Sequence, residues 1–455
     1  MTIDGFQSAV VDGTTVEDRA FPQDQAGTAG LHDGVCEAVP DWEQYSPPTI
    51  AAADIERKLA HVGKALPLSQ GAIEAHDLAS LTAIDARSVA DAIAPDRRLG
   101  RDLLRLAGGP HGNPLGKTPQ DLEEAIEWIG PQRASSFALA SSVLGAMLPN
   151  AGPWLNARLA WRRCMAAGSA VDLIASAAGR EDRRESLFLS AVLHPLHRLA
   201  LSVGYPGHYL AMAVDCEVRR ELLDDRERQM FSIGHREVVY RTLRSWGLAS
   251  RAFEPLMYCS EDYGALARLP EPLRTDVELL KLAIAVGWLA AGEWEAWDRV
   301  EVPPAYVMRL AGRASLAEIV ERTRQSVRDM ADFWPKPEEL ALCLDSRPAD
   351  VQWSHAVPYR NVSGQPMDFL AEFLRSMGFD LTCGDADDAR TEESTIVNCL
   401  WAYPKALERG AGERLIFTDV THAEPCSQYG RVLVLPASYA AIRDAWKHVA
   451  QSDCV

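Results

Sequence analysis

The sequence predicts a multidomain protein in which an all-α domain is followed by a small α/β domain with a mainly parallel sheet. Between residues 51 and 333, apolar residues recur at helical spacing, and glycine or proline separates the segments. After residue 345, short apolar runs rich in β-branched residues alternate with helical stretches. This alternation is typical of a parallel sheet covered by helices.

The first 50 residues have a different composition from the rest of the chain. They are rich in Gly, Pro, Asp, Gln and Thr, show little apolar periodicity, and end in Ser46-Pro47-Pro48. Such a segment buries too little apolar area to offset the entropy lost on ordering, so we expect a flexible tail over residues 1–50. The opening MTIDGFQ has neither a basic nor an apolar region, so we expect no secretory signal there.

The all-α domain is predicted over residues 51–312, and one of its helices shows the pattern. Thr118 is placed to cap the helix, and Pro119 fits the first helical position, where a missing N–H costs little. Apolar residues then recur at i, i+3, i+4 and i+7 from Leu122 to Ile129. Gly130 follows and is expected to end the helix.

A connecting helix and linker are predicted over residues 313–337. The helix, residues 315–333, has an apolar stripe of Leu316, Ile319, Val320, Thr323, Val327 and Met330. Such a stripe is stable only when it is buried, either within the chain or against a second copy of it. We expect packing within the chain, with a homodimer as the alternative.

The α/β domain is predicted over residues 345–455. Strands are expected near residues 351–358, 394–400, 414–420 and 431–435, and helices over 365–377 and 439–450. These elements alternate along the chain, which favours a parallel sheet.

Charge and composition exclude several classes of partner. With 46 Lys and Arg against 64 Asp and Glu, the formal net charge is −18, which argues against nucleic acid or an anionic membrane as the main partner. The longest apolar stretch, residues 186–205, contains His194, Pro195, His197 and Arg198 and is therefore not expected to cross a membrane. The nine cysteines are scattered without ligand spacing, which indicates free thiols in the cytoplasm.

Five segments of the helical part, taken in order, match sequence blocks of one known family. They are Leu66-Pro67, SVADAIAPDRRLGRDLLRLAGG (88–109), TPQDLEEAIEWIGPQR (118–133), AVLHPLHRLAL (191–201) and IGHREVVYRTLRSWGLASRAFEPLMY (233–258). On these segments the helical part resembles the HDOD family, which comprises regulatory relatives of HD-type phosphohydrolases. The resemblance implies an all-helical fold and a regulatory role, as in two-component and cyclic-dinucleotide pathways of bacteria.

The same resemblance implies that the metal site of an HD enzyme is degenerate here. That chemistry needs a histidine, a His-Asp pair and a further aspartate to hold the metal that activates water. The pair reads His194-Pro195, and Arg163 stands where the first histidine is expected. A guanidinium has no lone pair to donate and would repel a cation. We therefore expect no enzymatic activity, no catalytic residue, no bound metal and no cofactor.

The cationic and histidine side chains that are left define a candidate vestigial pocket: Arg163, His194, His197 and His235. Ordinary packing with a hydrogen bond is the usual role of a buried histidine. Two alternatives stay open at this point, a pocket for a small molecule or phosphate near Arg163 and an altered zinc site.

The α/β domain is similar in predicted architecture to a receiver domain but has none of its working residues. A receiver needs acidic residues after its first strand, an aspartate after its third and a lysine after its fifth. The first expected strand, residues 351–358, ends without acids, Asn398 stands at the second position and Leu435 at the third. The acidic run Asp385, Asp387 and Asp388 is typical of an exposed turn. This predicts a pseudo-receiver domain.

Together these observations predict a non-catalytic bacterial signal-transduction protein that docks a partner protein or senses a ligand. One alternative is a divergent, metal-dependent HD-type phosphohydrolase. The other is a receptor for a cyclic dinucleotide, which requires the Arg and His side chains to form a concave basic pocket.

Overall fold

The computed structural model describes residues 49–79, 84–108, 118–152, 154–248, 251–311, 316–329, 357–362, 367–383, 395–400 and 414–452. The predictions for the tail up to residue 48, for the linker beyond residue 329 and for the acidic run near Asp385 fall outside these ranges. The description that follows concerns the described residues alone.

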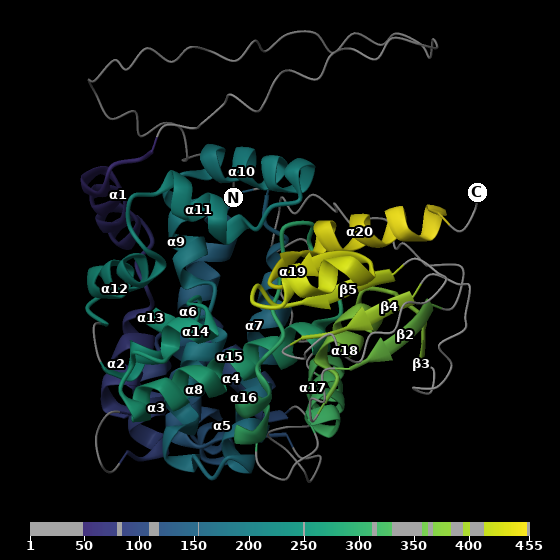
Figure 1. Ribbon diagram of the computed structural model, residues 1–455. Helices are drawn as coiled ribbons and strands as arrows, with labels where there is room; N and C mark the ends of the chain where they lie inside the picture. The colour runs from purple at the N-terminus through teal and green to yellow at the C-terminus, as the bar shows by residue number, and fades with distance from the viewer. Residues whose placement is uncertain are drawn as a thin grey trace, which may run out of the picture. The chain divides into compact units, whose positions relative to one another are not determined.

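The first part of the chain is helical as far as residue 329, as the sequence predicts (Figure 1). Its α-helices are α1 (Ala52–Ala65), α2 (Gln70–Ala79), α3 (Ala86–Ile93), α4 (Arg97–Gly108), α5 (Leu122–Ile129), α6 (Pro131–Met147), α7 (Ala157–Ala177), α8 (Arg184–Val192), α9 (Leu196–Gly204), α10 (Pro206–Arg219), α11 (Leu223–Met230), α12 (His235–Ser245), α13 (Glu254–Tyr258), α14 (Tyr263–Leu266), α15 (Glu271–Ala291), α16 (Ala305–Leu310) and α17 (Leu316–Asp329).

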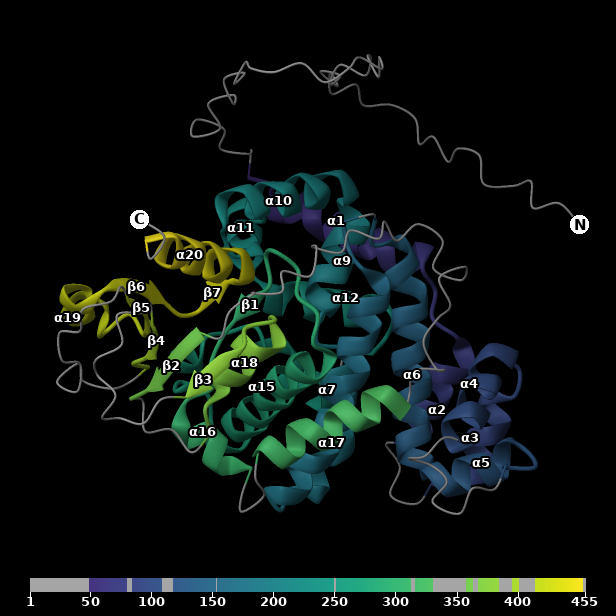
Figure 2. The ribbon, with the colours of Figure 1, turned by 90° about the vertical axis from the view of Figure 1, so that its right-hand side faces the viewer.

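Helices α7 and α15 form the centre of this part and lie side by side (Figure 2). Glycines allow the close approach. A Cβ atom on Gly287 of α15 would come within 2.7 Å of the backbone of Ala167 on α7. A Cβ atom on Gly168 would come within 2.8 Å of Phe188 and Val192 on α8. A larger residue at either position would therefore push the central helices apart.

Helix α17 packs on α7 and α15, so the apolar stripe predicted for the connecting helix is buried within the chain. Its buried residues are Leu316, Ile319, Val320, Thr323, Ser326 and Val327. Met330, the last residue of the predicted stripe, falls outside the described ranges. Arg324, on another face, lies 3.4 Å from Glu372 of the α/β part.

The long apolar stretch around His194 is not one helix. By length and composition the segment Glu181–Gly204 could cross a membrane, but most of the side chains in its apolar window are buried inside the protein. It consists of a short 3-10 turn, α8 and α9, and α8 and α9 are separated by a turn at Leu193–Pro195. This turn places His194 and His197 at the point where the two helices meet.

The α/β part contains a five-stranded parallel sheet in the order β3-β2-β4-β5-β6. The strands are β2 (Val357–Asn361), β3 (Leu381–Cys383), β4 (Thr395–Asn398), β5 (Arg414–Thr418) and β6 (Arg431–Val434), and the helices are α18 (Phe369–Ser376), α19 (Ala423–Cys426) and α20 (Tyr439–Ser452). The predicted fold class is thus confirmed. The first strand ends at Asn361 and not at residue 358 as expected, and β3 was not predicted.

Segments that are far apart in the sequence connect the helical part to the α/β part. Strand β1 (Arg299–Val300) pairs with β7 (Ala437–Ser438) in an antiparallel ladder. Trp294, just after α15, donates from Nε1 to Oγ of Ser376 at 3.0 Å. The backbone N–H of Tyr439 donates to the carbonyl of Asp298 at 3.0 Å. The loop after α15 therefore contacts both α18 and the start of α20.

Candidate functional site

Arg163, on the buried face of α7, forms a buried ion pair with Asp298. Its guanidinium donates to Oδ1 of Asp298 at 3.0 Å and to the carbonyl of Glu293 at 2.6 Å. Its charged carbon also lies 4.4 Å from the centre of the Trp288 ring, a cation–π contact. Arg163 stands where the family resemblance implies a metal-binding histidine. Its side chain is instead fixed by contacts within the protein.

His194 uses both ring nitrogens within the protein. Nδ1 lies 2.8 Å from the carbonyl of Ala191, and Nε2 accepts from Nε1 of Trp288 at 3.4 Å. This pattern fixes the tautomer with hydrogen on Nδ1. Burial lowers the pKa of His194 to about 4, so the ring is neutral near pH 7. Pro195 follows in the turn and has no ligand atom in its side chain, so neither residue offers a free site for a metal.

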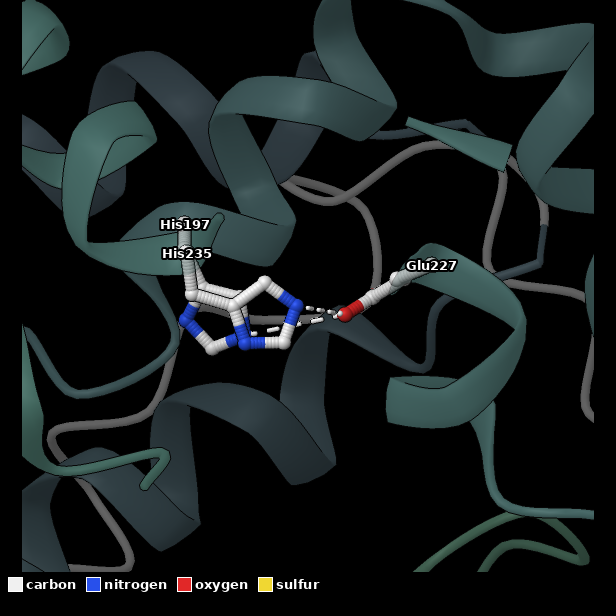
Figure 3. Close-up of side chains that lie close together, drawn as sticks. All are labelled: His197, Glu227 and His235. Atoms are coloured by element: carbon white, nitrogen blue, oxygen red, sulfur yellow. Dashed lines mark ion pairs between the residues drawn. The ribbon is translucent and has the colours of Figure 1, made fainter. Parts of the chain in front are cut away.

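His197 and His235 stack on each other, with ring centres 4.1 Å apart (Figure 3). His197 lies in the first turn of α9, and His235 is the first residue of α12. Nε2 of His235 is 2.8 Å from Oε2 of Glu227, and Nε2 of His197 is 3.8 Å from the same oxygen. Nε2 of His197 has no hydrogen-bond partner, whereas Nε2 of His235 and Oε2 of Glu227 lie in polar contact with each other. Three possible ligand atoms thus converge at one buried point.

Glu227 is held in place through its other oxygen. It lies on α11 and is 1% exposed, and its Oε1 accepts from Nε of Arg198 at 3.0 Å and from the Tyr209 hydroxyl at 2.7 Å. Burial alone would raise the pKa of Glu227, but the guanidinium of Arg198 and the contacts with His235 and His197 together outweigh burial, so the pKa lies below its ordinary value. The carboxylate is therefore charged and fixed, with Oε2 directed at the two imidazoles.

A cavity of about 150 Å³ lies beside these groups. Its lining includes Arg163, His194, Pro195 and His197, together with the rings of Trp288 and Phe373. Phe373 belongs to α18, so the α/β part contributes to the wall of the cavity. The wall of the cavity at His194 and Pro195 is therefore shared between the helical part and α18.

Each cation that lines this cavity has a carboxylate partner. Arg163 pairs with Asp298, Lys281 with Glu301, and Arg198 and Arg299 share Asp224. Glu295 adds a carboxyl group near Arg163, and burial together with the charge of Asp298 raises its pKa to about 7. The cavity is consequently polar but has no excess of positive charge.

The four side chains predicted to form one vestigial pocket lie in two neighbouring clusters. Arg163 and His194 contact Trp288, whereas His197 and His235 contact Glu227. His197 also lines the cavity with the first pair. Sequence reasoning missed Glu227 and Asp298, because no motif marks either one and Glu227 lies in the highly charged segment LDDRERQM.

The comparisons with known proteins concern the helical part. The HDOD domain model matches residues 67–261. No curated protein matches the chain. Among solved structures, an HDOD domain protein of unknown function from Geobacter sulfurreducens is 15% identical, with a TM-score of 0.48 over 61% of this chain and 98% of that one.

Two further solved structures resemble this chain with lower TM-scores. A candidate phosphohydrolase from Shewanella amazonensis SB2B is 16% identical, with a TM-score of 0.44 over 62% of this chain and 98% of that one. The MmoQ response regulator from Methylococcus capsulatus str. Bath is 20% identical, with a TM-score of 0.31 over 56% of this chain and 96% of that one. At these values the likenesses carry no argument about function. Residues 67–261 of this chain form an HDOD domain.

Proposed function

We propose that this chain is a non-catalytic regulatory protein of bacterial-type signal transduction. In this proposal the HDOD domain docks a protein partner or senses a small ligand in the cytoplasm. The main support is the state of Arg163, whose guanidinium is buried and paired with Asp298 where an HD enzyme would need a metal ligand. Removing a buried ion pair to admit a metal would cost several kcal/mol, roughly the penalty for an uncompensated buried charge.

The surroundings of His194 support the same proposal. An HD-type phosphohydrolase needs this imidazole as a metal ligand, but both of its nitrogens are engaged and Pro195 follows it. The phosphohydrolase alternative therefore has no support from this part of the site.

The cavity does not favour a cyclic-dinucleotide receptor. Such a ligand carries two phosphates and needs unpaired cations, whereas the Arg and Lys side chains of the cavity are already matched by carboxylates. A volume of about 150 Å³ is also smaller than the roughly 300–1,000 Å³ of typical ligand pockets. A smaller ligand, or none, fits better.

We propose further that the α/β part is a pseudo-receiver domain. Its strand order is that of flavodoxin-like doubly wound sheets. At the carboxyl end of the central strand β4, Asn398 donates from Nδ2 to Oδ1 of Asp368 at 3.0 Å. Asp368 also accepts from the Tyr359 hydroxyl and caps α18. An amide thus occupies the place where a receiver has its phosphoacceptor, which supports a role without phosphorylation.

A direct assay tests the lack of catalysis. We expect purified full-length protein to hydrolyse neither phosphoesters nor cyclic dinucleotides, whether Mn²⁺, Fe²⁺ or Zn²⁺ is supplied. The His194→Ala variant is the matched control, because it removes the one histidine of the degenerate pair. Turnover by the wild-type protein that disappears in His194→Ala would overturn the proposal.

A further inference from the structure

The cluster of His197, Glu227 and His235 is not explained by the proposed function. Each residue comes from a different helix, and all three side chains are buried. The three possible ligand atoms lie within 4.8 Å of one another. Nε2 of His197 is an orphaned polar atom, and burying such an atom without a partner costs about 1–3 kcal/mol. A bound ligand at this point would remove that cost.

The charged side chains around the cluster are paired within the protein. Arg198 pairs with Glu227 and Asp224, Arg299 shares Asp224, and Lys281 pairs with Glu301. These three cations and three carboxylates balance one another, so the attraction for a metal ion comes from the ligand atoms of the cluster themselves.

The donor set is that of a transition-metal site. Two imidazole nitrogens and one carboxylate oxygen, with a further position open, form the usual protein ligands of Zn²⁺ or Fe²⁺. In a tetrahedral zinc site, ligand atoms are about 3.3 Å apart, given Zn–N and Zn–O distances of about 2.0–2.2 Å. The observed separations from Oε2 of Glu227 are 2.8 Å and 3.8 Å, and all three atoms lie within 4.8 Å of one another. The stacked imidazoles would have to turn towards the ion for both nitrogens to coordinate it.

The surroundings also suit a metal. Glu227 is oriented by Arg198 and Tyr209 through its second oxygen, which is the outer contact that metal-binding carboxylates commonly have. His197 also lines the neighbouring cavity, whereas Glu227 and His235 do not. We propose that His197, Glu227 and His235 bind one divalent transition-metal ion that ties α9, α11 and α12 together.

This site differs from the degenerate HD position. The expectation that the protein holds no metal was drawn from Arg163 and Pro195, and neither belongs to the cluster. Glu227 likewise played no part in the expectation that no metal is bound. The proposed ion is a stabilising element and is independent of any hydrolysis.

Zinc binding by the full-length protein tests the proposal. After treatment with a chelator, the wild-type protein should take up about one equivalent of Zn²⁺ and show a higher Tm in its presence, because an ion that binds only the folded state stabilises it. His197→Ala and His235→Ala should each weaken binding at least about 100-fold, beyond the roughly 10–100-fold effect of losing an outer contact. Tyr209→Phe should weaken it about tenfold, since it removes only such a contact. His208→Ala, an exposed histidine on α10, should bind as the wild type does.

Two results would overturn the proposal. One is a wild-type protein that takes up no zinc, which would leave the direct contact between His235 and Glu227 as the explanation of the cluster. The other is a His197→Ala/His235→Ala double variant that still binds one equivalent of Zn²⁺. If the variants do not fold, X-ray absorption of the zinc-loaded wild type decides. Imidazole scattering in an N/O shell is expected, and a sulfur shell from cysteines would contradict the site.

Discussion

His194 and Arg163 both contact Trp288, and through it their roles in the fold are coupled. The Trp288 indole N–H donates to Nε2 of His194, while its ring lies against the Arg163 guanidinium. Protonation of His194 would remove the acceptor for Trp288 and place a second positive charge near Arg163. Burial lowers the pKa of His194, and the charges of Arg163 and Arg198 lower it further.

The stability of the protein should therefore depend on the charge state of His194. Its pKa is about 4 in the folded protein and about 6.5 in the unfolded chain, so the unfolded state binds more protons between these values. The contribution of a neutral His194 to stability is fully present above pH 6.5 and is lost as the pH drops towards 4. We expect the titration of this residue alone to lower the free energy of unfolding by roughly 2 kcal/mol between pH 7 and pH 5.

Denaturant unfolding of wild-type protein and His194→Gln at several pH values measures this effect. The variant should lose less stability than the wild type on acidification, with part of the slope retained because burial also lowers the pKa of His197. His208→Gln, on the exposed face of α10, should keep the wild-type slope. Identical slopes in the wild type and His194→Gln would show that His194 is not held neutral by the fold.

At the scale of side chains, the sequence indicated which residues belong to the site but not which residues they contact. The family resemblance assigned the HPLHR segment to the site, and His194 and His197 of this segment do line one cavity. The sequence did not show that Asp298 is the partner of Arg163, or that Glu227 is the partner of His235. The first pair is separated by 135 residues, and local periodicity does not predict a contact at that distance.

At the scale of single elements, the start of α5 shows where local signals compete. Thr118 was expected to cap this helix, but the cap is Asp121, whose side chain accepts from the N–H of Glu124 at 2.9 Å. Glu124 reaches back to the N–H of Gln120 at 2.6 Å. This reciprocal arrangement satisfies two free N–H groups, as a capping box does. A threonine cap would satisfy only one, so the helix begins after Asp121 and not after Thr118. The end of the helix at Gly130, with φ of 91°, is as predicted.

Helix α17 provides a prediction at the same scale. Ile319 is 2% exposed on the face that packs on α7 and α15, whereas its neighbour Glu318 is exposed. Ile319→Ala should lower the free energy of unfolding by about 2–5 kcal/mol, the usual cost of emptying a core position. Glu318→Ala should change it by less than about 0.5 kcal/mol. Equal effects of the two substitutions in denaturant unfolding would contradict the buried stripe.

At the scale of the whole molecule, the order of domains was predictable and their connection was not. The change from helical to alternating β-rich patterning predicted a helical part followed by an α/β part, and the described residues follow this order. The antiparallel pair of Arg299–Val300 with Ala437–Ser438 involves only two residues from each side, too few to produce a sequence signal. The contact of Trp294 with α18 likewise depends on three-dimensional placement. The prediction of a helix as the connection was therefore incomplete, because the loop after α15 also joins the two parts.

Trp294 gives the test of this connection. It is 5% exposed, and its ring lies 5.4 Å from that of Phe373 on α18 and 6.4 Å from that of Tyr439 at the start of α20. Trp294→Ala removes both ring contacts and the hydrogen bond to Ser376, at a cost of roughly 3–5 kcal/mol. Because one side chain touches both elements, hydrogen exchange followed by mass spectrometry should show faster exchange in α18 and α20 together. Trp128→Ala, a partly buried tryptophan on α5, should leave exchange in α18 and α20 unchanged. If Trp294→Ala accelerates exchange only within the helical part, the loop after α15 does not stabilise the α/β part, and α17 with the β1–β7 pair must hold it instead.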